Sequence, residues 1–237
     1  MEPLAIMATT DFADVIKSRY SVRAFKPERV PQAVLEQVFS LANCAPSNCN
    51  TQPWLVQVAS GEPLEALRAA IPQAMMSGDI TMDFPYAGKY HGVYKERQGE
   101  AANALFKVMG ITREDKVERN AAFMRNFTFF DAPHVAFLFI PQEYGLREAT
   151  DIGMYAQSLM LSLTAYGIGS CPQTSLGFHA DLVRKTLGVD EGFKLLFGIS
   201  FGYIDETAAA NKCRTARAAV NENTFFQGAN IRQDPKD

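Results

Sequence analysis

The chain has few of the residues that build metal sites and disulfide frameworks. Its 237 residues include only three histidines and four cysteines, and neither set has the spacing of a metal site or of a CxxC motif. Scattered cysteines in a chain of this length are more typical of reduced thiols in a cytoplasm than of a secreted scaffold. We therefore expect a cytoplasmic protein without a bound metal.

Long hydrophobic runs and an excess of one charge are also absent. The longest apolar run, residues 135–140, is far too short to cross a bilayer, and residues 1–10 lack the basic start and long apolar stretch of a secretory signal. The net charge is −3 and the pI is near 5.7, which gives no electrostatic footprint for nucleic acid or an anionic membrane. Any phosphate binding must therefore be local.

Several familiar catalytic motifs are missing as well. There is no GxSxG elbow and no paired set of carboxylates, and the Gly-Ile-Gly at 167–169 lacks the third glycine of a dinucleotide-binding fingerprint. A thiol hydrolase would have to use Cys171 and His179, but eight residues across a turn seldom bring such a pair into contact.

The pattern of apolar residues predicts one α+β domain over residues 1–237, with a flexible N-terminus at 1–10. Helices and strands alternate without a regular βαβ rhythm, and no repeat or linker divides the chain. Residues 75–125 carry many aromatic and charged side chains on a pattern that favours helix. The remaining spacing predicts helices at 11–18, 30–42, 63–71, 151–166 and 181–187, and strands at 54–59, 133–140 and 195–203. The sparsely charged helix at 151–166 should be buried in the core or in a subunit contact.

Two short polar segments stand out near the N-terminus. The first holds Arg19, Ser21 and Arg23 within five residues, and the second, 46–54, packs Ser, Asn, Asn, Thr and Gln between prolines. Guanidinium forks suit a phosphate, whereas amide and hydroxyl groups suit a polyol and the edge of a planar heterocycle. A flavin with a ribityl phosphate has all three parts. Taken alone, each segment is also compatible with a solvated helix end or a polar surface loop.

Two further segments lie in the second half of the chain. Residues 211–217 form a basic stretch that a surface patch would explain equally well on its own. Residues 167–175 could be a plain helix-to-strand turn. They also offer small residues and consecutive backbone N–H groups, which permit close approach to a planar ligand.

Taken in order, the four segments resemble the nitroreductase family of FMN flavoproteins. The matching motifs are R-x-S-x-R, A-P-S-x-x-N-x-Q-P-W, G-x-G-x-C-P-Q and N-x-x-R, and they extend from about residue 11 to 217. The stretch 125–133 looks most similar to the branch that reduces nitrobenzoates and other nitroaromatics. The resemblance implies the nitroreductase-like fold, a mixed and mainly antiparallel sheet flanked by helices.

The resemblance also implies residue roles around a noncovalent FMN. Arg19 and Arg214, with Lys212, would hold the phosphate, while Ser21 and the backbone of Tyr20 contact the phosphate and ribityl end. The residues assigned to catalysis tune the flavin and include no dedicated acid or base. They are Arg23 at the pyrimidine edge and Thr174, whose backbone N–H would address N5. The other expected cofactor contacts are Pro46, Ser47, Asn48, Asn50, Gln52, Pro172 and Gln173.

Family members are intertwined homodimers with two sites at the interface. Residues 46–52 would therefore approach the flavin of the other subunit, and the tail, 218–237, would wrap the partner. Residues 76–130 resemble a lid over the flavin. There, Phe127 would stack on a small aromatic substrate and Arg125 would favour one bearing a carboxylate. Alternatively, Phe127 leads into the buried strand and Arg125 is solvated.

The implied activity is the reduction of nitroaromatics by NAD(P)H through FMN, giving nitroso and hydroxylamino products. Some family members have an acidic residue and then glycine where this chain has Thr174 and Ser175. The preference for NADH or NADPH and the natural substrate therefore stay open. The alternatives are a flavoenzyme of the same fold acting on quinones, enones or halogenated phenols, one that fragments flavin, and a flavin-binding protein without turnover.

Overall fold

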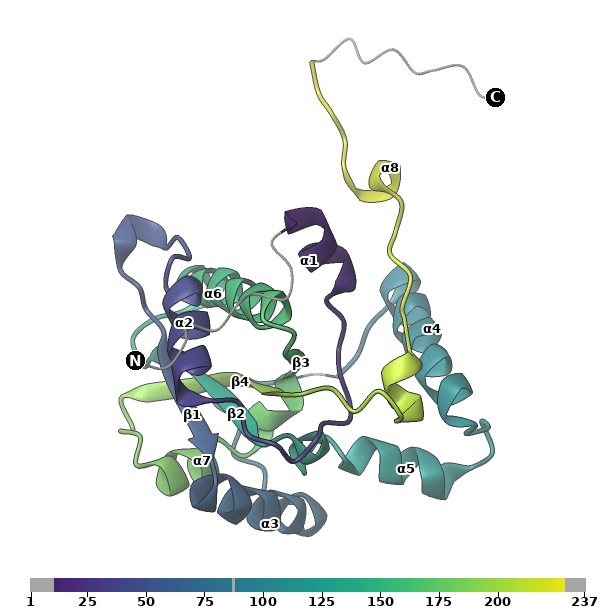
Figure 1. Cartoon of the computed structure of the whole chain (residues 1–237), viewed down its shortest axis with the longest axis horizontal. Coiled ribbons are helices and arrows are strands. Elements are labelled where there is room, and N and C mark those ends of the chain that lie inside the picture. The colour runs from purple at the N-terminus through teal and green to yellow at the C-terminus, as the bar shows by residue number, and fades with distance from the viewer. Residues whose placement is uncertain (1–10, 87, 229–237) are drawn as a thin grey trace.

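The fold is described from a computed structural model that covers residues 11–86 and 88–228. The expected flexible N-terminus, 1–10, and the last nine residues of the expected dimer-wrapping tail lie outside the described residues. Helices and a four-stranded sheet make up this part of the chain, so the α+β prediction is confirmed (Figure 1).

The helices lie between and around the strands in chain order. The α-helices are α1 Phe12–Ser18, α2 Gln32–Ala42, α3 Glu62–Ser77, α4 Gly92–Met109, α5 Lys116–Met124, α6 Leu146–Ala165, α7 Ala180–Leu187 and α8 Val220–Asn223. The strands are β1 Leu55–Ser60, β2 His134–Pro141, β3 Gly169–Gln173 and β4 Phe193–Gly202. Short 3-10 turns occur at η1 Asn48–Asn50, η2 Phe129–Asp131, η3 Thr174–Phe178 and η4 Ala209–Lys212.

The sheet has the order β1-β2-β4-β3, and each neighbouring pair of these strands is antiparallel. Parallel pairing occurs in isolated bridges, such as the one between Ser21 and Ser170. Strand β2 lies in the interior of the sheet and is covered on both faces. This position explains its unbroken apolar sequence, which predicted a buried strand.

Alternate residues of β2 supply two separate cores. Ala136, Leu138 and Ile140 pack in the cluster that contains residues of α2 and α6. Val135, Phe137 and Phe139 pack in the cluster that contains residues of α3 and α7. The result is a three-layer arrangement with the sheet in the middle.

Strand β3 was not predicted, because residues 169–173 were interpreted as a possible turn. Glycine, serine and proline have low strand propensity, so the local sequence carries little signal. The strand forms because it pairs with β4, and Pro172 is tolerated because β3 lies at the edge of the sheet. Gly169 is required by close packing, since a Cβ there would lie 2.7–2.8 Å from atoms of Ile204 and Val22.

Two helix boundaries differ from the prediction, and a third agrees closely with it. Helix α6 begins at Leu146, where the Glu148 carboxylate accepts the N–H of Gly145, so Asp151 lies inside the helix rather than at its start. Helix α2 begins at Gln32, close to the expected start. Helix α3 continues through Pro72 and ends before Gly78, whose φ of 75° suits a glycine C-cap.

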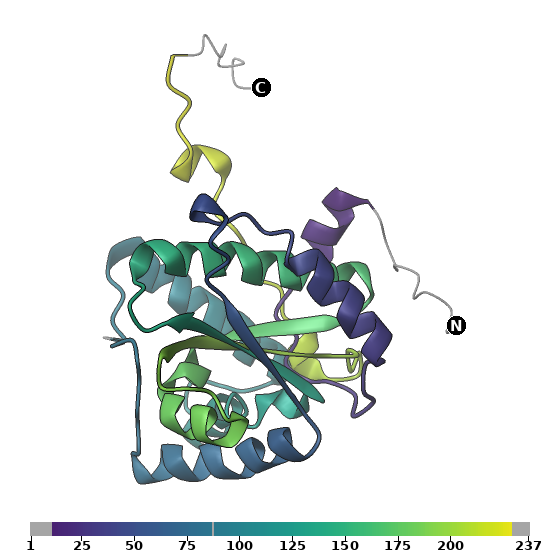
Figure 2. The same ribbon diagram turned by 90° about the vertical axis from the view of Figure 1, so that its left-hand side faces the viewer.

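The sheet edge at β3 carries a third, smaller apolar cluster that includes Val22, Phe25, Phe130 and Cys171. Within the described ranges, no helix combines the length and hydrophobicity that a membrane crossing demands. The end of the described tail stands away from the sheet and its covering helices (Figures 1 and 2).

Candidate functional site

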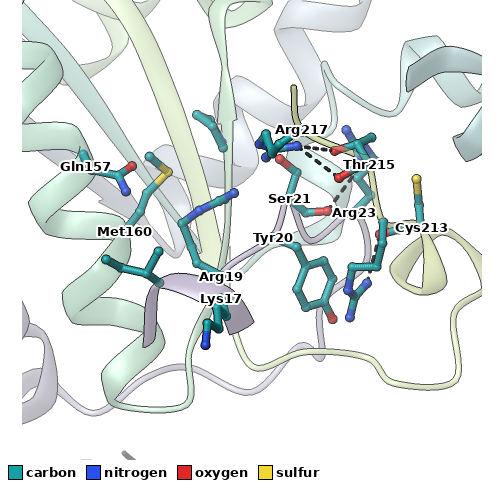
Figure 3. A pocket seen from close by; sticks show the side chains of 13 residues that line it. Lys17, Arg19, Tyr20, Ser21, Arg23, Gln157, Met160, Cys213, Thr215 and Arg217 are labelled. Atoms are coloured by element: carbon teal, nitrogen blue, oxygen red, sulfur yellow. Dashed lines mark hydrogen bonds between the residues drawn. The ribbon is translucent and has the colours of Figure 1, made fainter. Parts of the chain in front are cut away.

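A cavity of about 730 Å³ lies beside the edge strand β3. Its walls come from the end of α1, one side of α6, Pro172 and the segment that follows η4. Figure 3 shows Gln157 and Met160 on one side of the cavity and Thr215 and Arg217 on the other. Three of the motifs found in the sequence therefore meet in one place.

The cavity is strongly cationic. Its described lining contains five basic side chains and no carboxylate: Lys17, Arg19, Arg23, Arg214 and Arg217. Burial, together with the positive charge of Arg217, lowers the pKa of Arg19. Like charges gathered in a partly buried cavity repel one another, so this arrangement favours a bound anion. A phosphate dianion suits the donors and the charge.

Backbone pairing holds the R-x-S-x-R segment in place. The N–H of Val22 donates to the carbonyl of Ser170 in β3 at 3.0 Å. Ser21 forms a parallel bridge with Ser170, and Phe25 forms an antiparallel bridge with Ile204. Alternation along this extended segment buries Val22 at 1% exposure and leaves Ser21 and Arg23 at the cavity.

Asn211, which begins the N-x-x-R motif, joins this segment to the C-terminal arm. Its side chain is buried and accepts the Arg23 backbone N–H at 2.7 Å. Its amide nitrogen donates to the carbonyls of Ala24 and Asp205, each at 2.8 Å. The motif was recognised in the sequence, but no role was assigned to its asparagine. Because this buried asparagine bonds three backbone groups, it holds the R-x-S-x-R segment and the C-terminal arm in a fixed relative position.

The two arginines of the arm are held by different contacts. The Arg214 guanidinium carbon lies 3.4 Å from the centre of the Tyr20 ring, and its nitrogen donates to the carbonyls of Asn211 and Cys213. Arg217 donates to the carbonyl and hydroxyl of Thr215 at 3.1 and 2.9 Å. These contacts fix both cations while leaving donors of each guanidinium for a ligand.

The structure brings some predicted residues to the cavity and not others. Arg19, Tyr20, Ser21, Arg23, Pro172 and Arg214 all line it. Lys212 is exposed and does not line it, whereas Arg217, whose role the sequence did not indicate, does. The basic run 211–217 was the available signal, but its spacing alone could not tell which cations turn inward.

Gln173, expected as a cofactor contact, has its side chain turned into the protein. It is 3% exposed, and its carboxamide is bonded inside the protein to Asn126 and Ser200. Thr174, the next residue, is exposed and lines a second, smaller cavity of about 180 Å³. The aromatic walls of that cavity are Phe84, Tyr86 and Phe178.

The polar loop 46–52 does not line the cationic cavity of its own chain. The loop is shaped by the Ser47 hydroxyl, which accepts the N–H of Gln52 at 2.9 Å, and by Asp151, which accepts the N–H of Asn48 at 3.1 Å. Asn50 and Gln52 adopt the left-handed conformation, with φ of 56° and 48°. Among the hydrogen bonds of the described residues, none uses the side-chain amide of Asn50.

The structure contradicts the expected stacking of Phe127 on a substrate. This side chain is fully buried in the core between β2, α3 and α7, where it packs edge-on against His179. Phe127 therefore belongs to the run that leads into β2. Arg125 forms an ion pair with Asp131 at 3.0 Å and does not line either cavity, so its charge is already partnered.

The alternative of a thiol hydrolase has no support in this geometry. Burial raises the pKa of the Cys171 thiol to about 11, although Arg23 and Ser21 oppose the shift, so the thiol stays protonated near neutral pH. His179 uses Nδ1 on the carbonyl of Asp79 and is itself buried. In the described part of the chain, no cluster of histidine, cysteine or carboxylate side chains is arranged to hold a metal ion.

Comparison with known proteins agrees with this geometry. The model of the family described as "Nitroreductase family" matches residues 16–203. The chain belongs to the nitroreductase family. The family predicted from the four ordered motifs is thereby confirmed.

Individual relatives match over nearly the whole chain. Nitroreductase NfnB of Mycolicibacterium smegmatis is 47% identical over 213 residues, which cover 90% of this chain and 91% of the relative. A 4-nitrobenzoate reductase of Pseudomonas putida is 33% identical over 226 residues, covering 94% and 98%. This relative belongs to the branch that the stretch 125–133 indicated.

Solved structures show the same fold. The crystal structure of the FMN-dependent nitroreductase NfnB from Mycobacterium smegmatis in complex with NADPH has a TM-score of 0.86 and 46% identity, covering 90% of this chain and 96% of that one. The FMN- and NADPH-dependent nitroreductase NfnB from Sphigopyxis sp. strain HMH has a TM-score of 0.88 and 32% identity, covering 92% and 99%. The predicted nitroreductase-like fold is therefore confirmed.

Proposed function

We propose that this protein is an NAD(P)H-dependent nitroreductase that binds one noncovalent FMN per subunit and reduces nitroaromatic compounds in two-electron steps. Relatives that cover almost the whole chain are FMN- and NADPH-dependent nitroreductases or reductases of 4-nitrobenzoate. The observation that carries the proposal is the cavity itself. Its described lining supplies five cations, three of them from the motifs, and no carboxylate, which suits a phosphate-bearing cofactor.

When bound, FMN would supply the redox chemistry, a two-electron transfer from NAD(P)H to the substrate in a ping-pong sequence. A nitro group, one NAD(P)H and one proton give a nitroso group, NAD(P)⁺ and water. A second NAD(P)H and proton convert the nitroso group to a hydroxylamine. The fit to FMN rests on the donor set, because Arg19, Arg214 and Arg217 line one cavity together with Pro172, and Thr174 lines the second, aromatic cavity.

In this scheme the protein residues bind and orient the cofactor. Arg19 and Arg214 hold the phosphate, and Ser21 with the backbone of Tyr20 contacts the ribityl end. The guanidinium of Arg23 donates to the carbonyl of Ser21 at 3.2 Å, which directs it along the cavity wall. A fixed cation at the pyrimidine edge lowers the cost of negative charge that develops there on reduction. The backbone N–H of Thr174 is assigned to N5, at the reacting edge of the flavin.

The aromatic cavity beside Thr174 is the part of the site assigned to substrate. Phe84, Tyr86 and Phe178 line it, and the Tyr86 and Phe178 rings lie 6.0 Å apart between centroids. Apolar and aromatic walls favour a small aromatic ring. Because Pro172 and Thr174 project from the same face of the chain, a planar group lying over both would extend from the cationic cavity toward the aromatic one.

The segment 76–130, called here the lid segment, supplies two of these aromatic walls. Its helices α4 and α5 contain no fully buried residue, while Tyr86, Tyr90, Val93 and Tyr94 are exposed. Few buried contacts make a segment easier to displace than the core. This supports a role for the lid segment in admitting and covering substrate.

We also infer a homodimer in which residues 46–52 complete the partner's FMN site. The loop is exposed and does not line the cavity of its own chain. Beside the edge strand β1 lies a groove of about 700 Å³ lined by Phe39, Val56 and Leu187. The tail carries Phe225 and Phe226 at 72% and 66% exposure. A tail exchanged between subunits would cover both apolar surfaces.

A cytoplasmic location is part of this proposal. All four cysteines are free, and an enzyme that consumes NAD(P)H needs the reduced pool of the cell interior.

The function is tested with the purified protein. A yellow protein with a flavin spectrum, bleached by NADPH or NADH without oxygen and then reoxidised by 4-nitrobenzoate, would support the proposal. Product analysis should detect the hydroxylamine. A flavin that binds but is not bleached by either nicotinamide would show a binding protein without turnover. Reoxidation by a quinone but not by any nitroaromatic would favour the same-fold alternative.

A further inference from the structure

The carboxamide of Gln173 is fully used inside the protein. Its Nε2 donates to the backbone carbonyl of Asn126 at 2.9 Å and to the Asn126 side-chain oxygen at 3.3 Å. Its Oε1 accepts the hydroxyl of Ser200, which is itself completely buried. Both donors and the acceptor of the carboxamide therefore have partners, and none is left for a ligand.

The residues on either side of Gln173 face the two cavities. Pro172 lines the cationic cavity, and Thr174 lines the aromatic one. Successive side chains of an extended strand alternate, so Gln173 points into the protein where its neighbours point out. The anchored side chain thus fixes the position and direction of the backbone between Pro172 and Thr174, which faces both cavities.

Asn126 lies within the lid segment, just beyond its last helix, α5. Helix α5 ends at Met124, and the Asn126 side chain donates at 2.8 Å to the carbonyl of Phe123, which also accepts the backbone N–H of Asn126 at the helix end. The Asn126 carbonyl accepts both the N–H of Phe129 and Nε2 of Gln173. Asn126 therefore connects the end of α5 directly to β3.

The chain beyond Asn126 is held in an unusual conformation. Phe129, Phe130 and Asp131 have φ of 61°, 53° and 64°, so three consecutive residues other than glycine are left-handed. Such residues persist only where the surroundings hold them. Arg68 of α3 does this by donating to the carbonyls of Thr128 and Ala132, on either side of the turn. The connection between α5 and β2 is therefore held in one conformation by α3.

We infer that Gln173 is a positioning residue that couples the lid segment to the strand facing the cofactor, through its hydrogen bonds with Asn126. The inference rests on the proposed FMN site for its functional meaning, but the hydrogen bonds belong to the chain alone. A displacement of α5 moves Asn126 and, through its hydrogen bonds with Gln173, the backbone between Pro172 and Thr174. Conversely, a ligand that orders this backbone stabilises the end of α5.

The Gln173→Glu variant separates the two sides of the carboxamide. A carboxylate can still accept the Ser200 hydroxyl, but it has no donor for the two Asn126 oxygens. Ser200→Ala is the matched control, because it removes the contact to β4 and leaves both bonds to Asn126. Gln173→Met, which keeps the length of the side chain, is the second variant in case the buried carboxylate prevents folding.

Hydrogen exchange across residues 92–124 is the first measurement, made on FMN-free and FMN-bound protein. Exchange in α5 should be about fivefold faster in both Gln173 variants and unchanged in Ser200→Ala. Visible circular dichroism of bound flavin should change in the Gln173 variants while FMN affinity falls less than threefold, since the phosphate cations are untouched. The KM for 4-nitrobenzoate should rise about tenfold.

Two results would overturn the coupling. One is exchange in α5 that matches wild type in both Gln173 variants. The other is an equal change in Ser200→Ala, which would make Gln173 part of strand packing only. A wild-type protein that binds no FMN would instead refute the proposed function, and the exchange of the FMN-free variants would still decide the coupling.

Discussion

Asn211 accepts a hydrogen bond from the backbone N–H of Arg23 at 2.7 Å, although 188 positions separate the two residues in the chain. The same side chain donates to Ala24 and Asp205, so one buried amide joins the first and last walls of the cationic cavity. The position of Arg23 is therefore set by a residue that does not line the cavity.

Asn211→Ala should destabilise the fold and loosen the site together. It leaves the N–H of Arg23 without an acceptor, and an unpaired buried donor costs about 1–3 kcal/mol if water does not enter. It also removes one hydrogen bond from each of the carbonyls of Ala24 and Asp205, which keep their second, backbone donor. We expect the free energy of unfolding of the FMN-free protein to fall by about 2–4 kcal/mol. Denaturant titration measures this. Asn120→Ala, on the exposed side of α5, is the control and should change little.

FMN affinity should depend on Arg217 and not on Lys212. Arg217 lines the cavity close enough to Arg19 to lower its pKa, whereas Lys212 is exposed elsewhere. A charge-assisted contact with a phosphate is worth about 1.5–3 kcal/mol, so Arg217→Ala, like Arg19→Ala and Arg214→Ala, should weaken FMN about ten- to a hundredfold. Lys212→Ala should change affinity less than about fivefold, as expected for an exposed charge. Flavin fluorescence titration measures the affinity. A larger loss of FMN affinity in Lys212→Ala than in Arg217→Ala would refute this assignment.

Arg23→Gln should act on redox potential more than on retention of FMN. A neutral amide at the pyrimidine edge no longer stabilises the charge that appears on reduction. We expect the two-electron midpoint potential to fall by roughly 30 mV, which corresponds to about 1.4 kcal/mol. Spectroelectrochemical titration measures the shift, and Arg23→Lys, which keeps the charge, should recover most of it. A variant that loses FMN while the remaining holoenzyme keeps its potential would place Arg23 with the phosphate instead.

His134 should make the stability of the fold depend on pH. Val30 donates its N–H to Nε2, so the imidazole proton lies on Nδ1, which faces the Ser60 hydroxyl. Burial, with a smaller effect of Arg29, lowers the pKa of His134 from 6.5 to about 4. Between these values the unfolded chain binds a proton that the folded chain does not. Stability is therefore full above pH 6.5 and falls as the pH drops toward 4.

The loss across this pH range should be about 2–3 kcal/mol. Denaturant unfolding of the FMN-free protein at a series of pH values measures it. His134→Gln should flatten this part of the curve, and His91→Gln, at an exposed position, should keep the wild-type slope. Identical slopes for all three proteins would show that other groups, such as carboxylates, control the acid sensitivity.

Some features of the fold and site could be predicted from sequence because the signal was local. The unbroken apolar run of β2 marked a strand covered on both faces, and the guanidinium and amide side chains of the four motifs marked a ligand site. Strand β3 could not be predicted because its residues gain strand geometry only by pairing with β4. The inward turn of Arg217, the outward turn of Lys212 and the internal use of Gln173 depend on contacts between distant segments. No spacing rule encodes those contacts.

The last prediction concerns how the substrate is recognised. Phe127 is buried, so Phe84, Tyr86 and Phe178 are the aromatic residues in position to contact a substrate ring. Tyr86→Ala and Phe178→Ala should lower kcat/KM for 4-nitrobenzoate and for neutral nitrobenzene to a similar degree. The loss of one aromatic contact, about 0.5–1.5 kcal/mol, corresponds to about two- to tenfold. Arg125→Ala should cause no selective loss with the acid, because Arg125 is paired with Asp131 and lies over the Phe130 ring. Steady-state kinetics with both substrates decides between these residues. A loss of tenfold or more in Arg125→Ala that is confined to 4-nitrobenzoate would show that the ion pair opens and that Arg125 reads the carboxylate.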